Sequence, residues 1–281
     1  MHIQKRGRVR ARSIDPRPVG YRPVLTFENA KTIKGEKLGY RTGILYLAPA
    51  DEGLRDFAPV GDAAFRVPRT VCEYSTEGCR EGCLFRAGRA EFTPSIVTAR
   101  IRKTHRLFSD RELFLACLRY DIRKLVRYCA NKNWGKRKNK RITPAIRVNG
   151  TSDLAWLALL MAEEFPHVQF YDYTKLPKAW TRVRPNYHLT FSHSESNADE
   201  CVRALEHGMN VAVVFDVKRG KALPTEFMGR PVIDGDVHDL RFLDGYQGAV
   251  IGLRAKGPAK RNCSGFVVKT QTLVQIQPFA A

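Results

Sequence analysis

Three cysteines lie close together in the sequence, at Cys72, Cys79 and Cys83, with the spacing C-x6-C-x3-C. Glycine precedes the second and the third of them, at Gly78 and Gly82, so the backbone can wrap closely around a bound group. Thiolates are ligands of zinc and of iron–sulfur clusters. A structural zinc site takes four ligands, and no fourth cysteine follows at C-x2-C spacing. The pattern therefore favours a [4Fe–4S] cluster held by three cysteines, with one iron left open for another ligand.

Two alternatives remain open for the same cysteines. The first is zinc, with His105 as a candidate fourth ligand, although it lies well beyond Cys83 in the sequence. The second is that the three thiols bind no metal. Two of the remaining cysteines, Cys117 and Cys201, lie in apolar helical patterns, and we expect them in the core.

Polar residues follow several of the strands expected below. A site in a β/α barrel requires such groups at successive strand ends. We expect catalytic groups at three of these ends: Lys175, Glu195 and Lys218. Helix capping is the alternative role for the Ser and Asp residues at these strand ends, because both residue types are preferred helix caps. Capping does not account for the two lysines.

A further group of acids with one histidine lies at Asp234, Asp236, His238 and Asp239. Such side chains can bind a divalent metal, which would suit a metal-dependent nuclease. The spacing matches no standard metal-binding loop, and a polar loop or a network of ion pairs is the alternative.

The elements that must position these residues alternate between strands and helices. Strands of nearly continuous apolar residues separated by helical patterns indicate a parallel sheet with helices outside it. The expected strands are 43–49, 142–150, 167–174, 187–192, 210–217, 231–235 and 248–257, and the expected helices are 110–130, 154–165 and 197–208. This order predicts the α/β class, as a partial or complete parallel β/α barrel with its ligands at the carboxyl ends of the strands.

The chain divides into three parts on composition and pattern. Residues 1–38 are expected to form a basic arm, rich in Arg and Pro. Residues 39–257 form the barrel-like domain, and its cysteine loop spans 71–92. Residues 258–281 form a C-terminal tail.

The chain is strongly basic, with 48 Lys and Arg against 28 Asp and Glu and a net charge of +20. Such a charge makes an anionic partner plausible. Residues 131–141 carry six of the cations, no acid, and one tryptophan that can stack on a base. The expected nucleic-acid contacts are Trp134, Lys136, Arg137, Lys138 and Lys140. A solvated loop on a basic protein is the alternative.

Composition excludes several classes of protein. The hydrophobic content of 43% is too high for a disordered chain. No run of about 20 apolar residues is present, so no membrane span is expected. The N-terminal residues lack the apolar core of a secretory signal, and we expect a cytoplasmic protein.

A cysteine triad after the first strand of a β/α alternation resembles the radical S-adenosylmethionine (SAM) enzymes. Three elements are more closely similar to a phage protein family named after gene product eighty-eight: the glycine-flanked cysteine loop, the strand end RVNGTSD, and FYDYTK after a helix ending in FP. The resemblance covers roughly residues 40–220. It implies that the three cysteines ligate the cluster and that SAM binds the open iron. It also implies that Asn149, Ser152 and Asp153 contact SAM.

Together these features predict an iron–sulfur enzyme of radical SAM type, of phage or mobile-element origin. Its substrate would be a nucleic acid, a nucleotide or another anionic molecule. The alternative is a non-catalytic nucleic-acid-binding protein with a structural zinc site at the same cysteines. Colour distinguishes the two, because an iron–sulfur protein is brown and a zinc protein is colourless.

Overall fold

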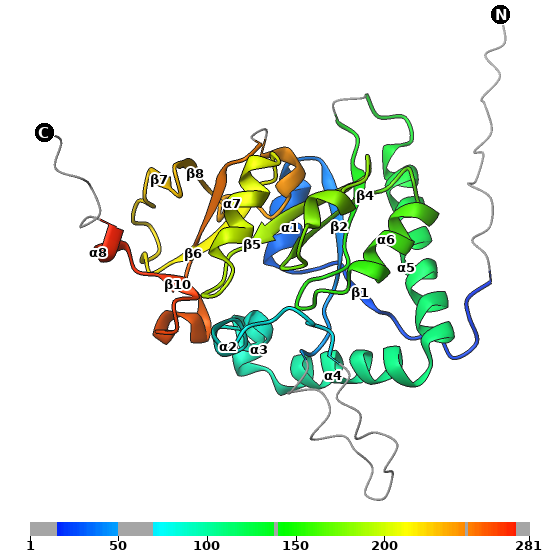
Figure 1. The fold of residues 1–281 in the computed structure, drawn as a ribbon. Coiled ribbons are helices and arrows are strands. Elements are labelled where there is room, and N and C mark those ends of the chain that lie inside the picture. The colour runs from blue at the N-terminus through cyan, green and yellow to red at the C-terminus, as the bar shows by residue number, and fades with distance from the viewer. Residues whose placement is uncertain (1–15, 50–69, 138–139, 245–246, 274–281) are drawn as a thin grey trace, which may run out of the picture.

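A computed structural model of the chain describes residues 16–49, 70–137, 140–244 and 247–273 (Figure 1). These residues form a ten-stranded sheet whose two faces are both covered. The strands are β1 (Leu25–Thr26), β2 (Tyr40–Leu45), β3 (Thr143–Arg147), β4 (Gln169–Thr174), β5 (Tyr187–Ser192), β6 (Val211–Phe215), β7 (Glu226–Phe227), β8 (Arg230–Asp234), β9 (Val250–Arg254) and β10 (Val267–Val268).

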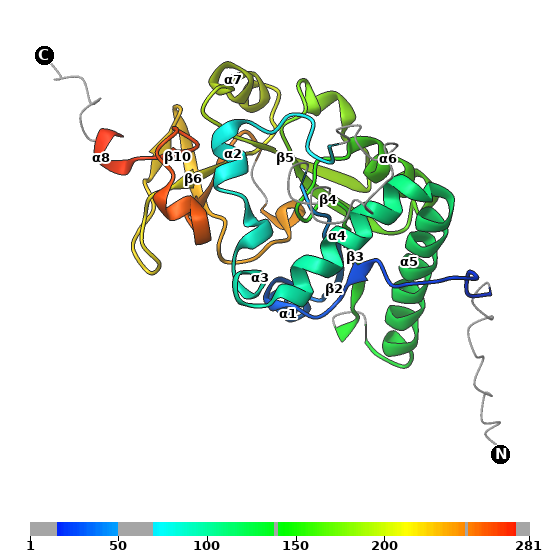
Figure 2. The same ribbon diagram turned by 90° about the horizontal axis from the view of Figure 1, so that it is seen from below.

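The helices lie between the strands along most of the chain. They are α1 (Ala30–Lys37), α2 (Glu77–Glu81), α3 (Arg89–Phe92), α4 (Pro94–Ser109), α5 (Arg111–Asn133), α6 (Ala155–Glu164), α7 (Ala198–Glu206) and α8 (Thr270–Leu273). Short 3-10 turns lie at Leu84–Arg86, Ala179–Arg182, Arg241–Leu243 and Gly257–Arg261. Both ribbon views place α2, α3 and α4 together beside one edge of the sheet (Figures 1 and 2).

The strand order is β1-β2-β3-β4-β5-β6-β9-β8-β7, and β10 pairs with β6 outside this path. From β2 to β8 every neighbouring pair on the path is parallel. The two end strands, β1 and β7, pair antiparallel with their neighbours. The carboxyl ends of the parallel strands therefore meet at one edge of the sheet, as the alternation of helices and strands predicts.

Consecutive residues of β4 show how the two faces of the sheet are covered. Phe170 is fully buried in the main core, which also contains apolar side chains of α5, α6 and α7. The next residue, Tyr171, packs on the opposite face with Leu240 and lies with its ring 5.5 Å from that of Phe242. Both faces of this strand are thus buried, which explains its nearly continuous apolar sequence.

Two helix ends follow directly from local sequence signals. The side chain of Asp110 accepts a hydrogen bond of 3.0 Å from the amide of Leu113 and so begins α5. At the end of α7, Gly208 has a φ of 76°, a conformation in which glycine is favoured. The expected helices 110–130 and 197–208 are therefore confirmed within a few residues.

The mainly parallel α/β class is confirmed, but a closed barrel is not. In the described residues the two end strands of the path, β1 and β7, do not pair with each other, so the sheet is open. The residues expected as an arm include β1 and α1, and those expected as a tail include β10 and α8. Ordered structure therefore extends to both sides of the expected domain. No helix among the described residues combines the length and the apolar character needed to cross a membrane.

Candidate functional site

The cysteine loop lies against the carboxyl edge of the parallel sheet. Its polar groups fix its local shape: Thr76 begins α2 and accepts a hydrogen bond of 3.3 Å from the amide of Cys79. The Sγ atom of Cys83 accepts a hydrogen bond of 3.4 Å from the amide of Phe85 and so begins the next 3-10 turn. Two of the three cysteines are therefore held in short turns, each closed by a side chain of the loop itself.

Residues from far along the chain clamp this loop in place. The carboxylate of Glu195, after β5, accepts hydrogen bonds from the Thr76 hydroxyl at 2.8 Å and from the Gly78 amide at 2.7 Å. From the other side, the side-chain amide of Asn262 donates to the Gly78 carbonyl at 3.2 Å. A Cβ atom on Gly78 would lie 1.9 Å from the Oγ of Ser264. Glycine at this position is thus required for the loop to fit between β5 and residues 262–266.

The neighbouring cysteines influence the ionisation of Cys72 and of Cys83. Burial raises the pKa of Cys72, and the charges of Cys83 and Cys79 raise it further. Burial also raises the pKa of Cys83, and the charge of Cys79 raises it further. The hydrogen bond from the Phe85 amide acts in the opposite direction and lowers this pKa. A group of neighbouring thiols out of water resists ionisation unless a positive charge compensates it.

Two basic side chains face these thiols. Lys175, directly after β4, lowers the pKa of Cys72 and of Cys83. Its ammonium group lies 5.6 Å from the centre of the Phe266 ring. Arg100, on α4, also lowers the pKa of Cys83, and its guanidinium donates a hydrogen bond to the Phe85 carbonyl. The sequence predicts Lys175 at the site, whereas it does not predict Arg100 there.

The residues expected to contact SAM are engaged within the protein. The side-chain oxygen of Asn149 accepts hydrogen bonds from the Ser152 hydroxyl at 2.9 Å and from the Leu154 amide at 2.8 Å. The amide groups of Asn149 in turn donate to the carboxylate of Asp172, at 2.7 and 3.1 Å. These contacts shape the turn from β3 into α6 and leave Asn149 and Ser152 buried.

Asp153 joins the same turn to the end of β4. Its carboxylate accepts hydrogen bonds of 2.7 Å from the Thr174 hydroxyl and from the Lys175 amide. Its own amide donates to the carbonyl of Val71, next to Cys72, at 2.7 Å. Burial raises the pKa of Asp153, and the two hydrogen bonds from Lys175 and Thr174 lower it in part. The turn therefore connects the cysteine loop to the carboxyl ends of β3 and β4.

A pocket of about 610 Å³ opens beside the loop. Its walls come from the loop, from the end of β4 and from the first turn of α7, and they include Thr76, Lys175, Ser194, Glu195 and Asn197. Burial opposes ionisation of Glu195, but hydrogen bonds from backbone amides and from Thr76, together with Lys175, hold its pKa below the ordinary value. The pocket thus has a cationic and an anionic side chain in its wall, next to the residues of the loop between Cys72 and Cys79.

Among the described residues, no group of three or more His, Cys, Asp or Glu side chains is arranged to hold a single metal ion. The acids at 234–239 have basic partners instead. Arg254 pairs with Asp234 at 2.9 Å and with Asp236 at 3.0 Å, and Arg147 pairs with Asp239 at 2.9 Å. These acids therefore form a network of ion pairs, as the alternative interpretation proposed, and the structure does not support a nuclease metal site there.

The other expected residues lie apart from the pocket. Lys218, expected as catalytic, is exposed after β6 and is not part of the pocket wall.

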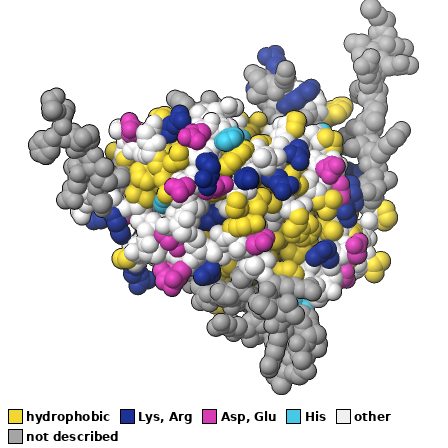
Figure 3. All heavy atoms as spheres, in the orientation of Figure 1, with side chains coloured by type: hydrophobic (Ala, Val, Ile, Leu, Met, Phe, Trp, Pro, Cys, Tyr) yellow, Lys and Arg dark blue, Asp and Glu magenta, His cyan; other side chains and the backbone are white. Residues whose placement is uncertain are grey.

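The basic loop follows α5, where the side chain of Asn133 exchanges two hydrogen bonds of 2.7 Å with the backbone of Ile142 and closes the loop. Trp134, at 68% exposure, and the side chains of Lys136, Arg137 and Lys140 are open to solvent, while Lys138 lies outside the described residues. Lys and Arg side chains stand at the tip of this loop (Figure 3).

Helix α4 and the basic residues that it carries are not among the elements expected from the sequence. A signal was present, because Pro94 occupies the first turn of the helix after Thr93, a position at which proline is common. Recognising this helix would have placed Arg100 within reach of the cysteine loop, since α4 follows that loop directly.

The comparisons with known proteins agree with the order of the motifs. A family model described as Gene product 88 matches residues 23–270, which include the strands of the sheet and the whole cysteine loop. No curated protein and no solved structure matches the chain. The match extends beyond the resemblance seen in residues 40–220 and takes in β1 and β10. The chain therefore belongs to the Gene product 88 family, a family of phage gene products.

Proposed function

We propose that this protein is an iron–sulfur enzyme of radical SAM type that acts on a nucleic acid, a nucleotide or another anionic substrate. One observation supports the proposal most strongly. Three half-buried cysteines lie in one loop at the carboxyl edge of a parallel sheet, and residues of the same loop line a polar pocket of about 610 Å³. In α/β proteins this edge is where ligands bind.

The donor set suits a cluster better than a single ion. A zinc ion needs its ligands to converge on one point at about 2.0 to 2.3 Å, and no three donors among the described residues do so. The thiolates of a four-iron cluster bind different irons, so they need to be neighbours without converging. What supports this assignment is that Cys72, Cys79 and Cys83 are near enough for Cys79 and Cys83 both to raise the pKa of Cys72.

When bound, a cluster with one iron free of protein ligands supplies an electron that cleaves SAM to a carbon radical. The side chains of this protein contribute electrostatics and shape. Lys175 and Arg100 place positive charge beside Cys83 and favour its thiolate. Residues 262–266 pack on the loop at Gly78 and Gly82, and burial raises the pKa of Cys72 and of Cys83.

The charges in the pocket beside the cysteine loop would suit the amino-acid part of SAM. That part carries an ammonium and a carboxylate group. Glu195 offers a carboxylate with a lowered pKa, and Lys175 offers an ammonium group, both in the wall of the same pocket. Asn149 and Ser152 support this pocket from within the fold, by holding the turn after β3, and do not need to contact the ligand.

Metal analysis of anaerobically purified protein tests the proposal. We expect about four irons and four sulfides per chain, a broad absorbance near 400 nm, and release of methionine from SAM when a reductant is added. One zinc per chain and no colour would overturn it. That result would favour the alternative, in which the thiols hold a structural zinc and the protein binds nucleic acid without catalysis.

A further inference from the structure

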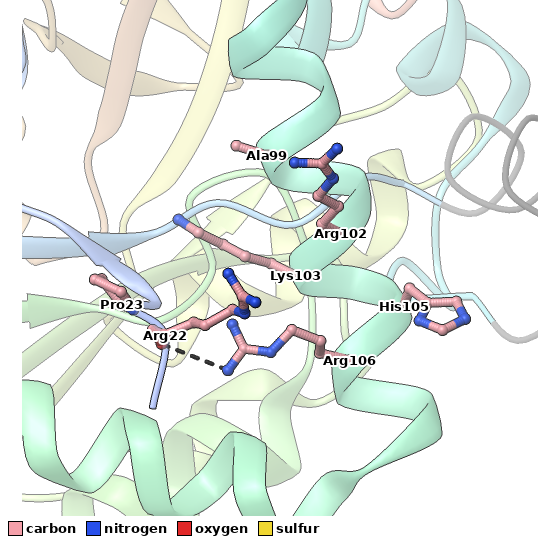
Figure 4. Close-up of a pocket in the computed structure, with 7 residues that line it drawn as sticks. All are labelled: Arg22, Pro23, Ala99, Arg102, Lys103, His105 and Arg106. Carbon is pink, nitrogen blue, oxygen red and sulfur yellow. Dashed lines mark hydrogen bonds between the residues drawn. The ribbon is translucent and has the colours of Figure 1, made fainter. Parts of the chain in front are cut away.

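A second pocket, of about 590 Å³, lies between residues 22–23 and α4 (Figure 4). Its wall contains five basic or titratable side chains and no acid, and consists of Arg22, Pro23, Ala99, Arg102, Lys103, His105 and Arg106. In the close-up the end groups of Arg22 and Arg106 lie side by side, and Lys103 extends across the pocket above them. Arg102 lies further along the helix, next to Ala99, and His105 points to the other side of the helix. None of these residues belongs to the cysteine loop or to the basic loop after α5.

Helical spacing builds one wall of this pocket. One face of α4 carries four of the lining residues, because they are spaced three, one and three positions apart: Ala99, Arg102, Lys103 and Arg106. The opposite face carries Ile101, Thr104 and Leu107, which are buried. The basic face is therefore turned away from the core and toward residues 22–23.

Asp121, on α5, fixes the facing wall. Its buried carboxylate accepts hydrogen bonds from the Tyr21 hydroxyl at 2.5 Å, from the Val24 amide at 2.8 Å and from the Leu25 amide at 3.0 Å. These bonds hold the chain on both sides of Arg22. The arginine is thus kept opposite α4 by an anchor that it does not itself contact.

The positive charges in this pocket have little compensation. In the part of the chain that the structure describes, Arg22, Arg102, Lys103 and Arg106 form no ion pair, and Arg106 donates instead to the Arg22 carbonyl at 3.4 Å. Burial lowers the pKa of Lys103 to about 8; Asp121 opposes this, and the positive charges of Arg100 and Arg106 add to it. Cationic groups held together in this way gain free energy when an anion enters.

We propose that this pocket binds the phosphate groups of a nucleic-acid strand or of a free nucleotide. Guanidinium groups match the geometry of phosphate oxygens and remain charged at any relevant pH. The volume of about 590 Å³ is within the range of pockets that hold molecules of nucleotide size. The site is separate from the cysteines, so it stands or falls independently of the metal content.

A charge-neutralising variant tests this assignment. Arg22→Gln/Arg102→Gln removes two exposed cations from the pocket, and Arg219→Gln/Lys221→Gln removes two exposed cations elsewhere. The probe is a short fluorescein-labelled oligothymidylate, followed by fluorescence anisotropy. We expect the pocket variant to bind about ten-fold more weakly than the parent, as the removal of two phosphate-binding cations implies, and the control to change much less.

Competitors identify the source of the phosphate. If unlabelled oligonucleotide displaces the probe and ATP and pyrophosphate do not, the ligand is a strand; displacement by ATP or pyrophosphate indicates a free nucleotide. Citrate, which carries carboxylates only, is expected to compete poorly. Equal weakening in the pocket variant and the control, or citrate competing as well as pyrophosphate, would overturn the proposal. If the double variant has a lower unfolding midpoint than the parent, Arg102→Gln alone replaces it in the same comparison.

Discussion

Glu195 accepts a hydrogen bond of 2.7 Å from the backbone amide of Gly78, which lies 117 residues earlier in the chain. The bond ties the end of β5 to the loop that carries the three cysteines. A second bond, from Thr76, reaches the other oxygen of the same carboxylate. Glu195 therefore positions the cysteine loop, in addition to its place in the wall of the pocket.

Replacing this carboxylate should loosen the loop. We expect Glu195→Ala to speed hydrogen exchange at the Gly78 amide by at least about ten-fold, because a charge-assisted hydrogen bond of roughly 1.5 to 3 kcal/mol is removed. Mass spectrometry of peptides from residues 71–83 measures the exchange. Glu206→Ala, which removes an exposed carboxylate from α7, is the control. Unchanged exchange together with abolished SAM cleavage would show that Glu195 acts on the ligand and not on the loop.

The three cysteines should be required for metal binding. We expect Cys79→Ser to lose iron and sulfide while its far-ultraviolet circular dichroism stays that of the parent, because the core lies in the sheet and in α5, α6 and α7. Cys263→Ser is the matched control: Cys263 is exposed, yet its neighbours Asn262 and Ser264 pack on the loop. If Cys263→Ser also loses the metal, the site has four cysteine ligands, and the three-thiol assignment with an open iron is wrong.

The sequence predicted the elements with strong local signals. Asp110 and Gly208 mark helix ends that the structure confirms, and β5 spans the same residues as the expected strand 187–192. It could not show that the sheet is open, because closure depends on which strands pair at its ends. β1 has two residues, Leu25–Thr26, too few to show an alternating pattern.

The candidate site was predictable only in part, because local sequence signals show where a strand ends but not which strand ends lie together. Strand-end position alone identified Lys175 and Glu195, both of which lie in the pocket wall. The same reasoning selected Lys218, which lies apart from it, since position after a strand does not specify which strand ends carry the site. The hydrogen bonds of Asn149 and Asp172 connect residues on different strands, and no local pattern encodes them.

A buried carboxyl group should make stability depend on pH. Burial raises the pKa of Asp172 to about 7, although Asn149 and Tyr187 donate hydrogen bonds to it. Because the pKa of Asp172 is higher in the folded protein than in the unfolded chain, its contribution to the free energy of unfolding is complete below about pH 4. This contribution is lost as the pH rises through about 7. We expect the free energy of unfolding of the parent, minus that of Asp172→Asn, to fall over this range in urea titrations. A constant difference would contradict the raised pKa.

The basic loop should contribute to binding of nucleic acid through its positive charges. Replacing Lys136, Arg137 and Lys140 by Gln should reduce the slope of log K against log salt by about 0.7 to 0.9 for each phosphate that the loop then fails to neutralise. Anisotropy titrations at several salt concentrations give the slope. Trp134→Ala should weaken binding with little change of slope, since stacking releases no counterion. A slope equal to that of the parent in the triple variant would mean that the loop is a solvated surface.

Asp121 should stabilise the fold as well as place Arg22. We expect Asp121→Ala to lower the free energy of unfolding by about 2 to 4 kcal/mol, because the Val24 and Leu25 amides and the Tyr21 hydroxyl all lose their acceptor. Tyr21→Phe removes one of the bonds and should cost about 1 kcal/mol. Urea unfolding compares the two. Similar decreases in both variants would show that the two backbone amides contribute nothing to the anchor.

The clamp on the cysteine loop also sets an order of events during synthesis. Asn262, which donates to the Gly78 carbonyl, is made 184 residues after that glycine. At ordinary rates of translation this interval is roughly 10 to 40 s. Until then Gly78 and Gly82 lack the residues that pack on them in the folded protein. The segment that packs on the cysteine loop is therefore synthesised well after the loop itself.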